Sequence, residues 1–119
     1  MQVFYLLRSL STVNLLDGDV TKTMVDYLVK RGYDSDDLKA MSSIKGGYRR
    51  AVHFISIVAQ SKPDIKNKHF LRHVEEFTQN CYRDMKPIQT IRLLKALQSL
   101  KNFKNEKLLN NLNKATIGK

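Results

Sequence analysis

A ten-residue pattern that recurs three times constrains the fold of this sequence more than any other feature. Three segments align without gaps: YDSDDLKAMS from Tyr33, IKNKHFLRHV from Ile65 and FKNEKLLNNL from Phe103. Each segment begins with a large apolar residue, carries a helix-capping residue two positions later, and has another large apolar residue at offset five. The starts lie 32 and 38 residues apart, and repeats of this length are typical of solenoids built from helix pairs.

The pattern predicts a tight turn between two antiparallel helices. The first apolar residue anchors the turn in the helix pair, the polar residue accepts a free N–H at the start of the next helix, and the offset-five residue begins the buried face of that helix. The anchors are Tyr33, Ile65 and Phe103, the caps are Ser35, Asn67 and Asn105, and the buried-face residues are Leu38, Phe70 and Leu108.

Helical spacing of apolar residues continues through the rest of the chain, which has only two prolines and five glycines to interrupt it. We therefore expect an all-α fold: a single domain of 119 residues that forms a short α-solenoid of antiparallel helix pairs. About seven helices are predicted, at 2–16, 20–31, 35–43, 48–60, 67–82, 87–101 and 105–114. The repeat-like units are 20–43, 48–82 and 87–114, and they follow the N-terminal helix 2–16.

Two of these helices are predicted to be buried on more than one side. The polar residues of helix 48–60 fall on one narrow strip: Arg49, His53, Ser56 and Gln60. The apolar residues of helix 87–101 span more than half of its circumference: Ile91, Leu93, Leu94, Ala96, Leu97 and Leu100. Such helices contact neighbours on both sides, as the stacking of helix pairs requires.

The chain is strongly basic, with 21 Lys and Arg against 11 Asp and Glu, a net charge of +10. Residues 1–44 hold 5 basic and 6 acidic side chains, whereas residues 45–119 hold 16 basic and 5 acidic ones. The electrostatic potential of a net charge this large attracts polyanions, either nucleic acid or an anionic membrane surface. The alternative is a lysine-rich surface that serves solubility, and 14 Lys against 7 Arg leave it open.

The candidate interface for RNA is a basic ridge on the second and third repeat-like units. Basic side chains occupy the exposed strip of helix 87–101 and continue through the following turn, while equivalent helices in a stack lie side by side and merge their strips. A glycine pair, Gly46-Gly47, precedes helix 48–60 and is a weaker candidate anion contact. The predicted RNA-binding residues are Arg49, Arg50, Arg92, Lys95, Lys101, Lys104 and Lys107.

One stretch resembles a known family. The segment IRLLKALQSLKNFKNEKLLNNL, within Thr90–Leu112, is similar to the degenerate repeats of FAST-kinase-like and heptatricopeptide proteins, and weaker copies lie at 25–41 and 54–74. The resemblance implies an organellar RNA-binding protein of the kind found in the mitochondria of apicomplexans and related protists. Because the chain has about three unevenly spaced units, it favours a small subunit embedded in a larger assembly over autonomous recognition of an RNA sequence.

No motif indicates an enzyme, a cofactor or a membrane span. The spacing of His69, His73 and Glu76 suits a metal, but His73 borders the predicted buried stripe of its helix, so we expect no metal site. Cys81 belongs to that stripe, and a single cysteine excludes an internal disulfide. Charged residues interrupt every long apolar run, and the acid-free opening of the chain, which resembles a mitochondrial presequence, also forms a good structural helix.

The sequence therefore predicts a non-enzymatic, RNA-associated helical-repeat protein. We expect a structural subunit of a mitochondrial ribosome or a related ribonucleoprotein, located in the organellar matrix. The expected partners are RNA, with ribosomal RNA as the leading candidate, and neighbouring protein subunits. No membrane and no small-molecule substrate is expected. The alternative is a protein-only scaffold or accessory subunit of an organellar complex, in which the charge is incidental.

Overall fold

All regular secondary structure in the described part of the chain, residues 18–32 and 48–117 of the computed structural model, is helical. This confirms the all-α class. The described residues form five α-helices, against about seven predicted for the whole chain, because predicted helices 2–16 and 35–43 and the Gly46-Gly47 linker lie outside them. The elements are α2 (Gly18–Lys30), α4 (Arg49–Ser61), α5 (Lys68–Cys81), the single 3₁₀ turn η1 (Tyr82–Asp84), α6 (Pro87–Ser99) and α7 (Glu106–Ile117).

Two of the predicted helix caps are present. The side-chain oxygen of Asn67 accepts the N–H of Phe70 at 3.1 Å, and that of Asn105 accepts the N–H of Leu108 at 3.0 Å. Each bond satisfies a backbone donor that the first turn of a helix leaves free. The two anchors of these turns, Ile65 and Phe103, are buried as predicted. The third copy of the pattern, at residues 33–42, lies outside the described residues.

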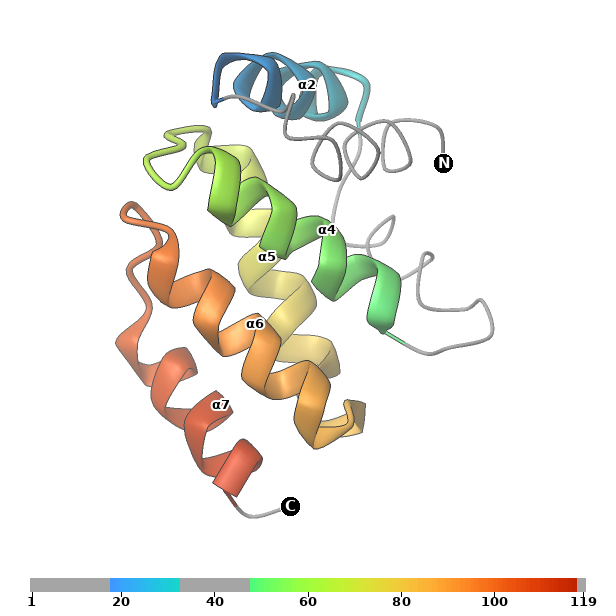
Figure 1. The fold of residues 1–119 in the computed structure, drawn as a ribbon, viewed down its shortest axis with the longest axis vertical. Coiled ribbons are helices and arrows are strands. Elements are labelled where there is room, and N and C mark those ends of the chain that lie inside the picture. The colour runs from blue at the N-terminus through green and yellow to red at the C-terminus, as the bar shows by residue number, and fades with distance from the viewer. Residues whose placement is uncertain (1–17, 33–47, 118–119) are drawn as a thin grey trace.

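The helices form two antiparallel pairs that lie next to each other (Figure 1). Helices α4 and α5 make the first pair, and α6 and α7 make the second. Helix α6 packs against both α4 and α7, and it runs in the same direction as α4. Helix α2 lies across the end of the first pair, where it contacts α4 and α5. The first helices of the two pairs are therefore direct neighbours.

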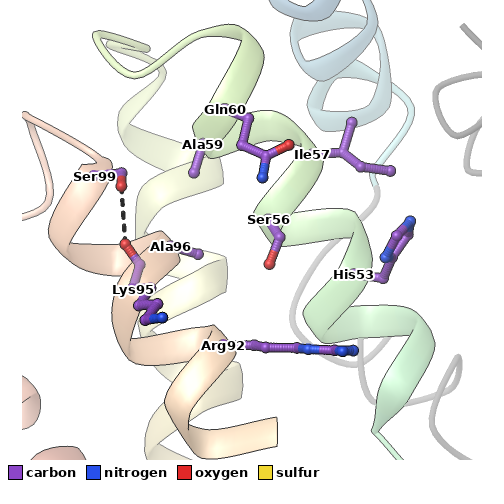
Figure 2. Close-up of a pocket in the computed structure, with 9 residues that line it drawn as sticks. All are labelled: His53, Ser56, Ile57, Ala59, Gln60, Arg92, Lys95, Ala96 and Ser99. Atoms are coloured by element: carbon purple, nitrogen blue, oxygen red, sulfur yellow. Dashed lines mark hydrogen bonds between the residues drawn. The ribbon is translucent and has the colours of Figure 1, made fainter. Parts of the chain in front are cut away.

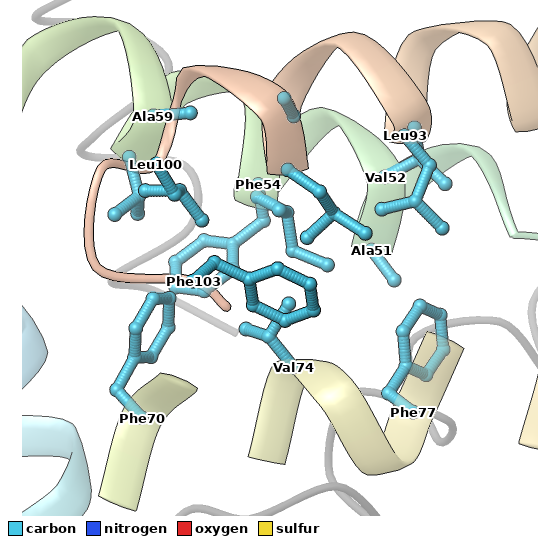
Figure 3. Close-up of a cluster of buried hydrophobic side chains, with 14 of the residues drawn as sticks. Ala51, Val52, Phe54, Ala59, Phe70, Val74, Phe77, Leu93, Leu100 and Phe103 are labelled. Carbon is cyan, nitrogen blue, oxygen red and sulfur yellow. The ribbon is translucent and has the colours of Figure 1, made fainter. Parts of the chain in front are cut away.

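A single apolar core joins the two pairs (Figure 3). The rings of Phe54 and Phe70 meet edge to face with centroids 6.3 Å apart, and this contact holds α4 on α5. Phe103 points into the same cluster from the turn between α6 and α7. Cys81 is buried in the core, as predicted. Ile91 was predicted to lie on a buried face of α6, but it is 36% exposed. The buried face of α6 covers a smaller part of the helix circumference than its apolar residues do.

Hydrogen bonds from the second turn to the first reinforce the contact between the pairs. The N–H of Lys101 donates to the carbonyl of Pro63 at 2.8 Å, and the amide nitrogen of Asn102 donates to the carbonyls of Asp64 and Ile65, each at 3.0 Å. In the alignment of the repeated pattern, Lys101 and Pro63 occupy the same position, two residues before the anchor. Equivalent turns of the two pairs are therefore in register.

The two capping asparagines also bind a carboxylate on an earlier helix. The amide nitrogen of Asn67 donates to Asp26 of α2 at 2.8 Å, and that of Asn105 donates to Glu75 of α5 at 3.0 Å. The bond from Asn67 is the largest influence that lowers the pKa of Asp26 below its usual range, and the bond from Lys22 adds to it. Each asparagine thus caps the start of its own helix and binds that helix to an earlier one.

Candidate nucleic-acid interface

An open groove lies between α4 and α6, the neighbouring first helices of the two pairs (Figure 2). Its volume is about 370 Å³. Ala59 and Ala96 lie between the two walls and are buried, and their small side chains allow the helices to approach closely. The lining residues are His53, Ser56, Ile57, Ala59 and Gln60 from α4, and Arg92, Lys95, Ala96 and Ser99 from α6.

The polar residues of the two walls have the same spacing. They stand at positions i, i+3 and i+7, which share one face of an α-helix. Because α4 and α6 run in the same direction, the two faces meet along the groove, and Figure 2 shows Arg92 extending toward His53. The α4 wall holds His53, Ser56 and Gln60, and the α6 wall holds Arg92, Lys95 and Ser99. The polar strips of α4 and α6 therefore face the same groove, whereas the predicted continuous ridge would also include residues outside it.

The groove has an uncompensated positive charge. Neither Arg92 nor Lys95 has an ion-pair partner in the residues that the structure describes, and no acidic residue lines the groove. Three acids in that part of the chain are paired with other cations: Asp26 with Lys22, Asp64 with Lys62, and Glu76 with Arg72. Two free cations on one wall of an open groove favour the binding of an anion.

The structure brings two of the seven predicted RNA-binding residues, Arg92 and Lys95, into the groove. The other five are not among its lining residues. Arg49 is exposed at the first position of α4, and Arg50 beside it is half-buried. The remaining three are exposed in the second turn and at the start of α7: Lys101, Lys104 and Lys107.

Four polar lining residues were absent from the predicted site: His53, Ser56, Gln60 and Ser99. Their signal was present in the sequence, since three of them form the polar strip of helix 48–60 and Ser99 lies on the exposed strip of helix 87–101. The predicted site consists of cations alone, whereas a groove also needs neutral hydrogen-bonding groups to orient a ligand.

The His69, His73 and Glu76 row does not form a metal cluster. No group of three metal-ligating side chains occurs within residues 18–32 and 48–117. His69 is exposed, and Glu76 lies 3.8 Å from the Arg72 guanidinium. Within these ranges, none of the helices combines the length and the apolar character that a membrane span requires.

Comparison with known families, curated proteins and solved structures finds no match to this chain.

Proposed function

We propose that this chain is a non-enzymatic protein that binds the RNA backbone through the groove between α4 and α6. The observation that carries the proposal is the pair of cations, Arg92 and Lys95, on one wall of a groove that no acidic residue lines, with neither cation in an ion pair among the described residues. Phosphodiesters are the commonest polyanions in a cell, and contacts with Lys and Arg supply most of the affinity of nucleic-acid-binding proteins.

The architecture that we propose is a short α-solenoid. Three observations support it: the two helix pairs share one turn pattern, their turns are hydrogen-bonded in register, and their first helices are neighbours. In a solenoid each repeat contacts only its neighbours, so the exposed strips of equivalent helices form one continuous surface. The groove is the part of that surface between two repeats.

We place the protein in a mitochondrial ribosome or a related ribonucleoprotein, on the strength of its resemblance to heptatricopeptide-like repeats. The second candidate function, a protein-only scaffold, is favoured by a different observation. Ile88 and Ile117 are 54% and 77% exposed on the second helix pair, and exposed large apolar side chains occur at protein interfaces. Nuclease treatment of the native assembly separates the two, because it releases only a subunit that RNA retains.

The decisive experiment is charge reversal on the α6 wall. The variant Arg92→Glu/Lys95→Glu should weaken binding to unrelated RNAs alike, because phosphate contacts carry no sequence information. Each phosphate contact to a single strand adds about −0.7 to the slope of log K against log salt, so loss of two contacts should flatten the slope by about 1.4. Binding measured by fluorescence anisotropy at several salt concentrations tests both expectations.

A matched control is Lys66→Glu/Lys68→Glu, which makes the same change in net charge. Both lysines are exposed outside the groove, and a negative charge is tolerated there because the N-terminus of α5 is close. This variant should bind RNA much more tightly than the groove variant. Equal affinities for the two variants, or no binding by the parent at low salt, would rule out the groove and favour the scaffold.

A further inference from the structure

The two walls of the groove differ in chemistry. The α6 wall carries the cations, and its Ser99 hydroxyl already donates to the Lys95 carbonyl at 2.9 Å. The α4 wall carries the Ser56 hydroxyl and the Gln60 amide beside His53, and neither the Ser56 nor the Gln60 side chain has a hydrogen-bond partner within the described ranges. A hydroxyl and an amide each offer both a donor and an acceptor. One wall is therefore suited to a charged group and the other to a neutral polar group.

The dimensions of the groove favour one strand of nucleic acid. The axes of packed helices lie about 8–10 Å apart. A duplex is wider than its own major groove, which is about 12 Å across. Arg92 and Ser99 are separated by seven residues, which corresponds to about 10 Å along a helix. A stacked strand rises about 3.4 Å per nucleotide. The polar row on the α6 wall is therefore about as long as the rise of three stacked nucleotides.

We infer that the groove distinguishes RNA from DNA, because a strand whose phosphates contact Arg92 and Lys95 turns its sugars toward Ser56 and Gln60. The 2′-hydroxyl is both a donor and an acceptor, and it is the group by which a protein recognises RNA at a given site. Ser56 and Gln60 are the residues that bind it. This inference rests on the proposed function, since it requires phosphates on the α6 wall.

The test compares two 12-nucleotide single strands, oligouridylate and oligodeoxyuridylate, which differ only at the 2′ position. The parent should bind the RNA strand about tenfold more tightly, as expected for one or two additional hydrogen bonds. In Ser56→Ala/Gln60→Ala the RNA affinity should fall to about that of DNA, while the DNA affinity stays unchanged. The control Gln79→Ala/Gln98→Ala removes two exposed amides outside the groove and should keep the parent's preference. Equal thermal melts of all variants exclude unfolding.

The outcomes separate this inference from the proposed function. Arg92→Glu/Lys95→Glu should weaken the binding of RNA and DNA by the same factor. If the parent binds both strands equally, or prefers DNA, or if the Ser56→Ala/Gln60→Ala variant weakens both alike, recognition of the 2′-hydroxyl is wrong and phosphate binding stands. If neither strand binds at low salt, the proposed function fails and this inference fails with it.

Discussion

Among the described elements, the first helix pair, α4 and α5, has α2 on one side and the second pair on the other, and it holds them in different ways. Helix α2 is bound through side chains: the hydroxyls of Thr21 and Ser61 are 2.6 Å apart, and Asn67 donates to Asp26. The second pair is bound through the backbone of the turns as well, with the Lys101 N–H on the Pro63 carbonyl. We call these contacts the α2 junction and the pair junction.

The difference between the two junctions shows what the repeated pattern specifies. Both use an asparagine cap bound to a carboxylate, and both place apolar side chains in the one core, but only the pair junction joins two turns in register. Backbone groups in register require that both partners have the same turn geometry, whereas a side-chain bond adapts to different partners. The pair junction is therefore a contact between equivalent units, and the α2 junction is a contact between different ones.

Loss of the apolar anchor should break the pair junction. Phe103→Ala removes a buried ring from the cluster that joins the two pairs and should cost about 3–5 kcal/mol of stability. Phe70→Ala, within the first pair, should cost about as much, because its ring contacts Phe54. Chemical denaturation measures both. A parent-like transition midpoint for either variant would contradict the anchoring role that the repeated pattern assigns to it.

A charge swap tests the α2 junction. Asn67→Asp retains the oxygen that caps α5 but replaces the donor to Asp26 with a second carboxylate, and it should cost about 1–2 kcal/mol at neutral pH. The double variant Asp26→Asn/Asn67→Asp restores the bond with the two partners exchanged, and it should recover most of this loss. Asn105→Asp, which faces Glu75, should cost less, because further hydrogen bonds hold the pair junction.

The pH dependence provides a control for the swap. Since the pKa of Asp26 is lowered in the folded protein, its bonds stabilise the fold fully above the unfolded value of about 3.9 and stop doing so as the pH falls through the folded value. Asp26→Asn should therefore show a smaller drop in melting temperature below about pH 4 than the parent. An equal drop in both proteins would exclude Asp26 as the titrating group.

The smallest effect is expected for the side-chain bonds between the two turns. Asn102→Ala removes two hydrogen bonds to backbone carbonyls and should cost about 1 kcal/mol. Hydrogen exchange of the neighbouring Lys101 amide should become faster than in the parent, because the turns separate more often. If the Lys101 amide exchanges at the parent's rate, its bond to Pro63 holds the turns together without help from Asn102.

The features that the sequence predicted correctly are local ones. A cap at Asn67 or Asn105 binds an N–H three residues later, so a short pattern is enough to find it. The carboxylate partners of these caps were not predicted, because Asp26 and Glu75 lie 41 and 30 residues earlier in the chain. Helix packing decides which residues so far apart in the sequence meet, and a local pattern carries no information about that packing.

The groove was predicted in part for the same reason. Periodicity identified the polar strip of each wall, and the stacking argument predicted that strips of equivalent helices meet. The strips alone do not show how far a shared surface extends. Lys101, Lys104 and Lys107 follow Arg92 and Lys95 closely in the sequence, yet they lie beyond the groove because the turn and α7 lead away from it. Their predicted role in RNA binding is therefore separate from the groove.

Pro63 fixes the direction of the backbone hydrogen bond between the two turns. Proline has no N–H, so the backbone bond between aligned positions of two turns has only one possible sense here: Lys101 donates and Pro63 accepts. At the same aligned position before α4, the N–H of Arg31 already serves the Tyr27 carbonyl, and Pro63 has no proton to give to an earlier turn. Among the described turns, the backbone hydrogen bond between aligned positions therefore runs in one sense only, from the second helix pair to the first. The single imino acid at position 63 fixes which turn donates and which accepts.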